Sequence, residues 1–311
     1  SIVSSLPNRS ATFTYDTAQL GPWQARLVEV GNRRITYRSN NPGVPHQYGL
    51  FDNQNQFISG ITYTFQGPKL TRLVDNTPGN LKDIAYRYNA QGLRIEKIVN
   101  GITHSYFYQG DQLIEERYQT TILQYIYDEQ GHLTALSYQS GTTSDIYYYY
   151  RDQLGNILGL CNGVGQLVVS YTYDSWGYPL PNGIIDTSGI NLATMNPFRY
   201  KGYYYDVETG YYYCQSRYYH PGWCRWISAD SSAYVDPQSI AGLNLYAYCS
   251  NNPVMYSDPS GKFAITTLVL IGFGVGLFIG AGASAIGQAA SNNWNFNDIN
   301  WIQVGLDGVL G

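Results

Sequence analysis

A short tyrosine-based unit recurs along the middle of the chain and limits what the chain can fold into. The unit reads Tyr-x-Tyr-Asp/Asn-x-x-Gly and is followed by an aliphatic residue. Clear copies are YRYNAQGL (86–93), YIYDEQGHL (125–133) and YTYDSWG (171–177), and looser copies are YFYQGDQL (106–113) and YYRDQLGNI (149–157). One small unit must therefore stack on copies of itself. The anchor tyrosines are 19 to 23 residues apart, at Tyr88, Tyr108, Tyr127, Tyr150 and Tyr173.

The unit has the chemistry of a type I turn. Asp or Asn occupies the first turn position, where its side chain can accept a nearby backbone N–H. Gly occupies the fourth position, where it tolerates a positive φ. The sequences VNGI (99–102) and CNGV (161–164) add Asn-Gly signals for tight hairpins. A period of about 20 residues then corresponds to two short strands and two turns.

The residues between the turns alternate as strand residues do. Leu93, Ile95 and Lys97 alternate with Arg94 and Glu96, which indicates a strand with one wetter face. One hairpin cannot bury a face alone, so successive hairpins must stack. We therefore predict a mainly β protein, in which a long, spiralling antiparallel sheet of hairpins forms a shell.

Tyrosine is unusually frequent, with 32 copies beside 33 glycines in 311 residues. A wide, curved sheet can leave one face against a water-filled interior. Tyrosine supplies area there for stacking across strands, and it keeps its hydroxyl hydrated. We expect the repeat tyrosines to line such a wet inner wall. Residues 1–85 are less regular, and we assign them to the same sheet as its N-terminal β segment.

The character of the chain changes after Lys262. Residues 263–287 carry no charge, and this length exceeds the ~20 residues that a helix needs to cross a bilayer. Its glycines have small-xxx-small spacing, which lets helices approach closely in lipid. We predict an apolar, Gly-rich helix within residues 262–291, which either crosses a membrane ahead of a toxin or packs inside the shell. Residues 292–311 begin a further, truncated region, and we expect both chain ends to be cut.

Charge and cysteine patterns exclude several function classes. A net charge of −4, with 13% charged residues, offers no basic surface for nucleic acid. No Cys or His pair has metal-ligand spacing and no phosphate-binding motif occurs, so we predict no metal and no cofactor. We expect four buried thiols, with disulfides as the alternative. The cysteines are Cys161, Cys214, Cys224 and Cys249.

Four stretches resemble the RHS-repeat-associated core domain, and the upstream units resemble RHS/YD repeats. The stretches are YKGYYYDVETGYYYCQSRYYHP (200–221), RWISAD (225–230), GLNLYAYCSNNPV (242–254) and DPSG (258–261). The resemblance assigns residues 86–190 to the repeats and 191–261 to the core domain. The members of the RHS family are secreted or surface polymorphic toxins, toxin-complex components and teneurins. It implies a hollow β-cocoon, plugged at one end by the core domain, that encloses and delivers a C-terminal toxin absent from this chain.

The resemblance also implies partners and a location. The partners are the toxin domain of the same polypeptide and the immunity protein that binds that toxin. The location is outside the cell or at the cell surface, with residues 263–287 as a single-pass membrane contact. A rival interpretation is a binding module whose exposed tyrosines stack on cell-surface glycans.

In several family members the core domain is an aspartyl autoprotease that cuts behind the DPxG motif. Two carboxylates that share a proton supply this chemistry, one activating water and one acting as the acid. The resemblance points to Asp230 in ISAD as the catalytic carboxylate, and to Asp258 in DPSG as the cut region and a weaker catalyst. Arg225, at the family's Gly-Arg position, could hold a carboxylate ionised. Asp236 is a spare carboxylate.

Three positions depart from the family pattern. His220 replaces the aspartate of Asp-Pro, Cys224 replaces the glycine before the arginine, and Lys262 replaces the leucine after DPxG. The last change bears directly on self-cleavage. A structural alternative is therefore kept, in which Asp230 caps a turn and Asp258 opens an Asp-Pro turn.

Overall fold

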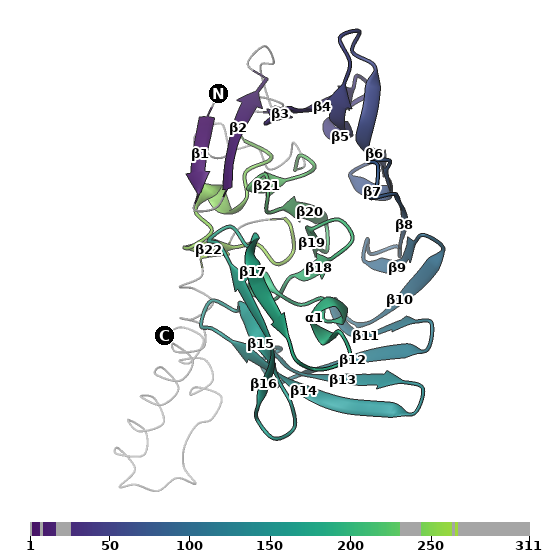
Figure 1. Cartoon of the computed structure of the whole chain (residues 1–311), viewed down its shortest axis with the longest axis vertical. Helices are drawn as coiled ribbons and strands as arrows, with labels where there is room; N and C mark the ends of the chain where they lie inside the picture. Colours follow the sequence, from purple (N-terminus) through teal and green to yellow (C-terminus); the bar gives the residue numbers. More distant parts are fainter. Residues whose placement is uncertain (1, 7–8, 17–25, 231–243, 263–264, 267–311) are drawn as a thin grey trace, which may run out of the picture.

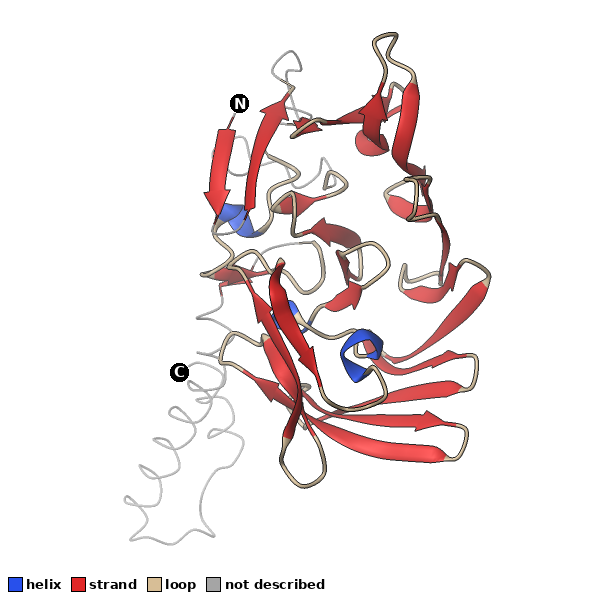
Figure 2. Ribbon diagram, viewed as in Figure 1, coloured by secondary structure: helices blue, strands red, loops and turns tan. Residues whose placement is uncertain are grey.

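The computed structural model describes residues 2–6, 9–16, 26–230, 244–262 and 265–266. Within them the chain is almost entirely β structure (Figure 2). The helical elements are α1 (Leu192–Met195) and the 3-10 turns η1 (Tyr200–Gly202) and η4 (Cys249–Asn251). The prediction of a mainly β protein is confirmed.

Seventeen strands form one antiparallel sheet. Strands that follow one another in the sequence pair with one another, so the sheet is a continuous meander. The strands are β1 (Ile2–Leu6), β2 (Arg9–Tyr15), β3 (Leu27–Val30), β4 (Arg33–Arg38), β5 (Asn41–Phe51), β6 (Phe57–Gln66), β7 (Lys69–Asp75), β8 (Lys82–Tyr88), β9 (Arg94–Val99), β10 (Ile102–Gln109), β11 (Gln112–Tyr118), β12 (Thr121–Tyr127), β13 (Leu133–Ser140), β14 (Thr143–Arg151), β15 (Ile157–Cys161), β16 (Leu167–Tyr173) and β17 (Pro179–Asp186). In the described residues β1 and β17 each pair along one side, so the sheet is open.

A smaller sheet lies inside the curve of the large one (Figure 1). It contains β18 (Tyr204–Asp206), β19 (Tyr211–Cys214), β20 (Arg217–His220) and β21 (Arg225–Trp226). We call these four strands the core sheet. A two-stranded pair, β22 (Tyr256–Ser257) and β23 (Ile265–Thr266), follows it.

The turns of the repeat form as predicted. At Asp128 the side-chain Oδ1 accepts the backbone N–H groups of Gln130 and His132, and the backbone carbonyl accepts the N–H of Gly131. Each fourth-position glycine has the left-handed backbone that favours glycine. The φ angles are between 79° and 83° at Gly92, Gly131, Gly155 and Gly177. The Asx side chain and the glycine together end one strand and start the next.

The two Asn-Gly signals have different outcomes. Asn100 and Gly101 both have positive φ and join β9 to β10, as a tight hairpin requires. CNGV is not such a hairpin. Asn162 instead opens the longer repeat-type turn, in which Gly165 has φ 81° and Gln166 N–H binds the Asn162 side chain. The second glycine, three residues after the Asx, decides the turn type here.

The anchor tyrosines tie neighbouring strands together. In four of the five predicted anchors the hydroxyl donates to a backbone carbonyl of the preceding strand, at 2.7 to 2.9 Å. The pairs are Tyr88 to Leu70, Tyr108 to Arg94, Tyr127 to Leu113 and Tyr173 to Ile157. Tyr150 was the wrong anchor: it is 55% exposed, and Tyr149 beside it turns inward to bind Asn196.

The expectation of a wet inner wall is wrong for this part of the shell. The first tyrosine of the clear units is at most 4% exposed, at Tyr86, Tyr125 and Tyr171. These rings pack against the core sheet and the segment that leads into it, for example Tyr86 on Tyr218 of β20 and Tyr125 on Phe198. Tyrosine is used because it fills a thick layer between two sheets and its hydroxyl reaches a polar partner inside that layer.

The predicted apolar helix, including the membrane segment 263–287, lies outside the described residues except near its start. There Ile265 and Thr266 form β23, a strand paired with β22, so these two residues are not helical. Among the residues that the structure describes, no helix has the length and apolar character needed to span a bilayer.

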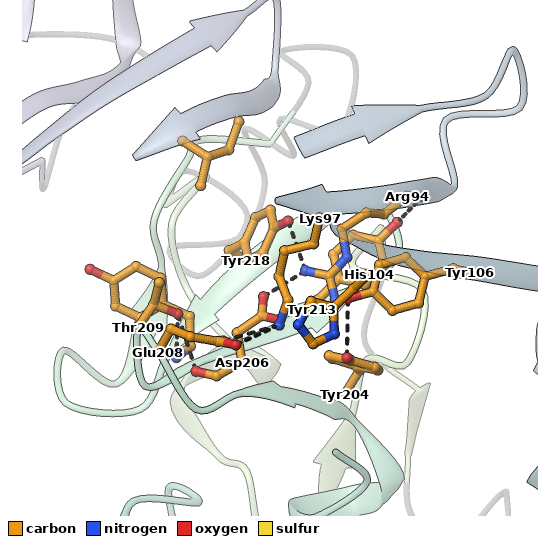
Figure 3. A network of polar contacts seen from close by, with 12 residues as sticks. Arg94, Lys97, His104, Tyr106, Tyr204, Asp206, Glu208, Thr209, Tyr213 and Tyr218 are labelled. Carbon is orange, nitrogen blue, oxygen red and sulfur yellow. Dashed lines mark hydrogen bonds and ion pairs between the residues drawn. The ribbon is translucent and has the colours of Figure 1, made fainter. Parts of the chain in front are cut away.

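A buried charge network joins the core sheet to the large sheet (Figure 3). Asp206, at the end of β18, lies with Oδ2 2.6 Å from Arg94 Nη1 and with Oδ1 2.9 Å from Lys97 Nζ. Glu208 adds a second carboxylate, 3.0 Å from Lys97 Nζ. Nearby on β11, Glu116 accepts a hydrogen bond from the hydroxyl of Tyr204 at 2.9 Å. The two sheets are therefore connected through charged groups and not only through apolar contact.

The network changes the predicted faces of β9 at Arg94 and Ile95. Arg94 and Lys97 are at most 3% exposed, whereas Ile95 is 39% exposed. The alternation predicted the strand and placed Lys97 with the inner residues, but it put Arg94 on the wetter face and Ile95 on the inner one. The pairing of β9 with β8 is irregular here: Glu96 pairs with Arg87 and Arg94 with Tyr88, which breaks the simple alternation. A carboxylate on a distant segment makes the charged side chains the inner residues, because pairing offsets the cost of their burial.

Burial and pairing act in opposite directions on the pKa values of the network. Burial raises the pKa of Asp206, but Arg94 and Lys97 outweigh it and hold that pKa below its ordinary value. Burial is the largest influence on the pKa of Arg94 and lowers it, but Asp206 and the surrounding tyrosines together raise it well above its ordinary value. The Arg94 guanidinium also lies 4.4 to 5.7 Å from the ring centres of four tyrosines. The groups are therefore charged at neutral pH.

We expect Asp206→Asn to lower the free energy of unfolding by about 3–5 kcal/mol, because it leaves Arg94 and Lys97 buried without full compensation. Asp83→Asn is the matched control. Its partner Arg72 lies 2.6 Å away, but both side chains are more than half exposed, so the loss should be at most about 1 kcal/mol. Chemical denaturation followed by intrinsic fluorescence measures both, and equal losses would contradict a central role for the network.

Candidate functional site

The DPSG turn (258–261) lies against the turn that joins β19 to β20. The Ser216 hydroxyl lies 2.7 Å from the carbonyl oxygen of Ser260 and 2.6 Å from that of Gly261. Arg217 Nε donates to the same Gly261 oxygen at 2.5 Å. The end of the DPSG motif is thus held by donors from the core sheet.

Gly261 fits this place because it has no side chain. Its φ is +67°, and a Cβ on it would lie 2.5 Å from the carbonyl oxygen of Cys214 and 2.7 Å from Ser216 Oγ. Both the left-handed backbone and the close approach favour glycine. The DPSG turn can therefore pack this closely against the turn between β19 and β20 only with glycine at position 261.

Arg217 brings the two predicted carboxylates together. Its Nη2 lies 2.8 Å from Asp230 Oδ2 and 3.6 Å from Asp258 Oδ2. The guanidinium also lies over the Trp226 ring, 4.3 Å from its centre. A single buried arginine therefore contacts both carboxylates and the Gly261 carbonyl.

Asp258 is both a turn residue and a perturbed acid. Its Oδ1 accepts the backbone N–H of Lys262 at 3.1 Å, and its own N–H donates to the Tyr203 hydroxyl at 2.7 Å. Burial raises the pKa of Asp258 to about 6; Arg217 opposes this shift, and the nearby charge of Asp230 adds to it. A carboxyl group of this kind can be protonated while its neighbour is ionised.

A cavity of about 610 Å³ opens beside the cluster. Arg217, Asp230 and Lys262 line it, together with Lys69 at the start of β7 and Gln91 in the turn between β8 and β9. The side chain of Asp230 is 18% exposed, whereas that of Asp258 is 3% exposed. Water can therefore reach Asp230, and Asp258 lies on the sealed side of the cluster.

Arg225 lies elsewhere. Its Nη2 donates to Asn244 Oδ1 at 3.2 Å, and its guanidinium lies over the rings of Tyr15 and Tyr246. The ion pairs that the structure gives to the two carboxylates come from Arg217, which the sequence analysis missed. The only signal for Arg217 was its place inside the family-like stretch QSRYYHP. Asp236, the spare carboxylate, lies outside the described residues.

In the part of the chain that the structure describes, no cluster of metal ligands is found, and two of the four thiols are buried and protonated. Within the described ranges no three His, Cys, Asp or Glu side chains are grouped to hold a metal ion. The four cysteines are not in disulfides: Cys214 and Cys249 are buried, and Cys161 and Cys224 are half-buried. Burial raises the pKa of Cys214 well above its ordinary value and that of Cys249 to about 12, so both stay protonated.

Comparison with known proteins gives one family and several relatives. A family model described as Teneurin YD-shell matches residues 51–254. The tRNA nuclease WapA of Bacillus subtilis (strain 168) is 35% identical over 248 residues, which cover 76% of this chain and 9% of WapA. The toxin protein Tse5 of Pseudomonas aeruginosa is 26% identical over 300 residues, which cover 78% of this chain and 21% of Tse5. The chain spans less than a quarter of either relative.

A solved structure shares the fold. The crystal structure of TcdB2-TccC3-Cdc42 matches with a TM-score of 0.54 and 21% sequence identity. The match covers 81% of this chain and 13% of that one. At this identity the likeness concerns the fold alone.

We expect Gly261→Ala to destabilise the chain more than Gly141→Ala. Both positions have positive φ, which costs alanine about 1–2 kcal/mol. At Gly141 a Cβ would meet nothing within 4 Å, whereas at Gly261 it would meet the Cys214 carbonyl, which adds ~1–3 kcal/mol. Thermal or chemical unfolding measures the difference, and equal losses would show that the DPSG turn is not held as described.

Proposed function

The chain belongs to the teneurin YD-shell family, and from this premise we propose that it is part of a shell that encloses and delivers a toxin. The toxin domain would follow in the same polypeptide. Two relatives that share this segment are named as a tRNA nuclease and a toxin, although the chain spans 9% and 21% of them. Their activities belong to them, and for this chain we propose only the enclosing role.

One structural observation carries the shell proposal: the large sheet curves around the core sheet and is bonded to it on opposite sides. On one side the hydroxyl of Tyr63 on β6 is hydrogen-bonded to that of Tyr211 on β19, and Arg94 on β9 forms an ion pair with Asp206 on β18. On the other side the hydroxyls of Tyr212 and Tyr219 donate to carbonyls of the turn after β16. A wall fixed in this way to an inner plug is suited to closing one end of a container.

We also propose a division of the chain. Residues 1–85 form the N-terminal part of the wall, 86–190 the YD repeats, and 191–261 the core domain that plugs the shell. The boundary between 190 and 191 is supported by the end of the strand meander at β17 (Pro179–Asp186) and by the start of the core sheet at β18; the boundary between 85 and 86, which falls inside β8, rests on the repeat pattern alone. Residues 262–291 would lead into the toxin and 292–311 would begin the region beyond.

The proposed partners follow from the enclosing role. They are the C-terminal toxin domain and, through it, an immunity protein; the proposed location is secreted or at the cell surface. A membrane contact through residues 263–287 belongs to the same proposal. A cell-surface glycan is a further candidate partner, because Tyr148 and Tyr150 on β14 are each at least 50% exposed and can stack on sugar rings.

Protease protection tests the enclosing role. In the natural full-length protein, the polypeptide beyond residue 311 should resist proteinase K while the shell is folded. The same region expressed alone is the control and should be digested quickly. We expect digestion at least tenfold slower in the intact protein, since enclosed chain is cut only after opening. Equal rates would contradict enclosure.

We propose self-cleavage behind the DPSG turn as a second function, favoured by the contacts of Arg217. In this scheme Asp230, which borders the cavity and pairs with Arg217, takes a proton from water as the water oxygen bonds to the scissile carbonyl carbon. Asp258, buried and raised in pKa, gives its proton to the leaving nitrogen as the carbon–nitrogen bond breaks. Arg217 stabilises the charge that develops on the carbonyl oxygen. The products are a carboxyl group and an amine.

Self-cleavage predicts two fragments from the 311-residue chain. Asp230→Asn should slow fragment formation by about 10²–10⁴-fold, and the exposed Asp145→Asn should leave it unchanged. The rate should fall as the pH rises through about 6, because Asp258 must keep its proton to act as the acid. Gel analysis over time and pH checks both. A wild-type chain that stays intact from about pH 4 to 8 would contradict self-cleavage and leave the shell proposal standing.

A further inference from the structure

We infer that Ser216 is a positioning residue for self-cleavage: its hydroxyl holds the end of the DPSG turn next to Arg217 and Asp230. The inference rests on the self-cleavage proposed above and adds to it the residue that places the substrate. In this chain the substrate is a segment of the same polypeptide, so its position must be set by contacts within the fold.

Ser216 meets the DPSG turn with both its backbone and its side chain. Its N–H donates to the Ser260 carbonyl at 3.2 Å. Its hydroxyl lies within 2.7 Å of the two carbonyl oxygens of Ser260 and Gly261. A serine hydroxyl has one proton, so this proton is shared between two adjacent carbonyls of the turn. The side chain therefore orients the backbone at the point where the chain leaves the motif.

Arg217 makes this orientation matter for the chemistry. One edge of its guanidinium, Nε, donates to Gly261, and Nη2 pairs with Asp230 at 2.8 Å. Because the guanidinium is planar and rigid, these two contacts set the place of the motif end relative to Asp230. This placement lasts only while the Gly261 carbonyl oxygen remains hydrogen-bonded to Arg217 Nε. The Ser216 hydroxyl is the second donor to that oxygen and holds it in position.

Ser216 can be changed without disturbing the charges of the site. Arg217 is shared among Asp230, Asp258 and two backbone carbonyls, so its removal alters every part of the cluster. The hydrogen bonds of the Ser216 hydroxyl in the described part of the chain go to the DPSG turn alone. A substitution there separates positioning from acid–base chemistry.

The experiment compares Ser216→Ala, Ser216→Thr and the exposed Ser144→Ala in the whole 311-residue chain. We expect Ser216→Ala to form fragments about 10- to 100-fold more slowly, because a misplacement of the reacting groups by about 1 Å can cost ~10²-fold in rate. Its pH profile should be unchanged, because Asp230 and Asp258 remain. Mass spectrometry should show cuts at more than one bond, and Ser216→Thr, which keeps a hydroxyl, should restore a single cut. Ser144→Ala should behave as the wild type.

A second measurement separates this inference from self-cleavage itself. In an uncut Asp230→Asn background, Ser216→Ala should increase the hydrogen exchange of the Lys262 amide, while Ser144→Ala should not. If the wild type is never cut but exchange rises, self-cleavage fails and Ser216 is shown only to hold the turn, which overturns its proposed role in cutting. If Ser216→Ala is cut at the wild-type rate and at one bond, the inference is also wrong.

Discussion

The ion pair between Arg94 and Asp206 is the contact on which the rest of the fold depends. Arg94, Lys97 and Glu116 are charged residues on the inner face of the large sheet, and all are at most 3% exposed. Each would cost several kcal/mol if it were buried alone. Asp206 of the core sheet supplies the partner of Arg94 and Lys97, and Tyr204 adds a donor to Glu116, which His104 of the large sheet also contacts. Without β18, Arg94 and Lys97 would be left on the inner face of β9 without the carboxylate that they share.

Local chemistry explains why much of the large sheet was predictable. The Asx side chain, the glycine three residues later and the tyrosine directly before act within one turn and its neighbouring strand, as at Asp128, Gly131 and Tyr127. The errors come from choices that a short sequence cannot decide. Two glycines compete in the turn that begins at Asn162, and two adjacent tyrosines, Tyr149 and Tyr150, compete for the inner face. The burial of the repeat tyrosines could not be predicted from the repeat alone, because it depends on the core sheet that packs on them.

The candidate site was only partly predictable, for the same reason. Resemblance pointed to Asp230 and Asp258, but it placed the arginine at Arg225, the arginine nearest to Asp230 in the sequence. In the structure both carboxylates lie next to Arg217 on β20. Strands β20 and β21 are paired, and of the two arginines Arg217 is the one that faces the DPSG turn. No spacing rule predicts that choice. Ser216 was missed because a single hydroxyl near a turn has no pattern of its own.

Arg94 and Arg217 form similar buried clusters with carboxylates, but the pKa values of the carboxyl groups shift in opposite directions. Each is a buried guanidinium that lies against aromatic rings and pairs with carboxylates. Arg94 and Lys97 both contact Asp206, and they hold the pKa of Asp206 below its ordinary value. Around Arg217 one cation is shared by two carboxylates, and burial raises the pKa of Asp258 to about 6. Where cations and carboxylates are equal in number, the link is ionic at neutral pH, whereas one cation shared by two carboxylates leaves one acid able to hold a proton beside a cavity. The ratio of charges, more than the residue types, separates the structural cluster from the one that can do chemistry.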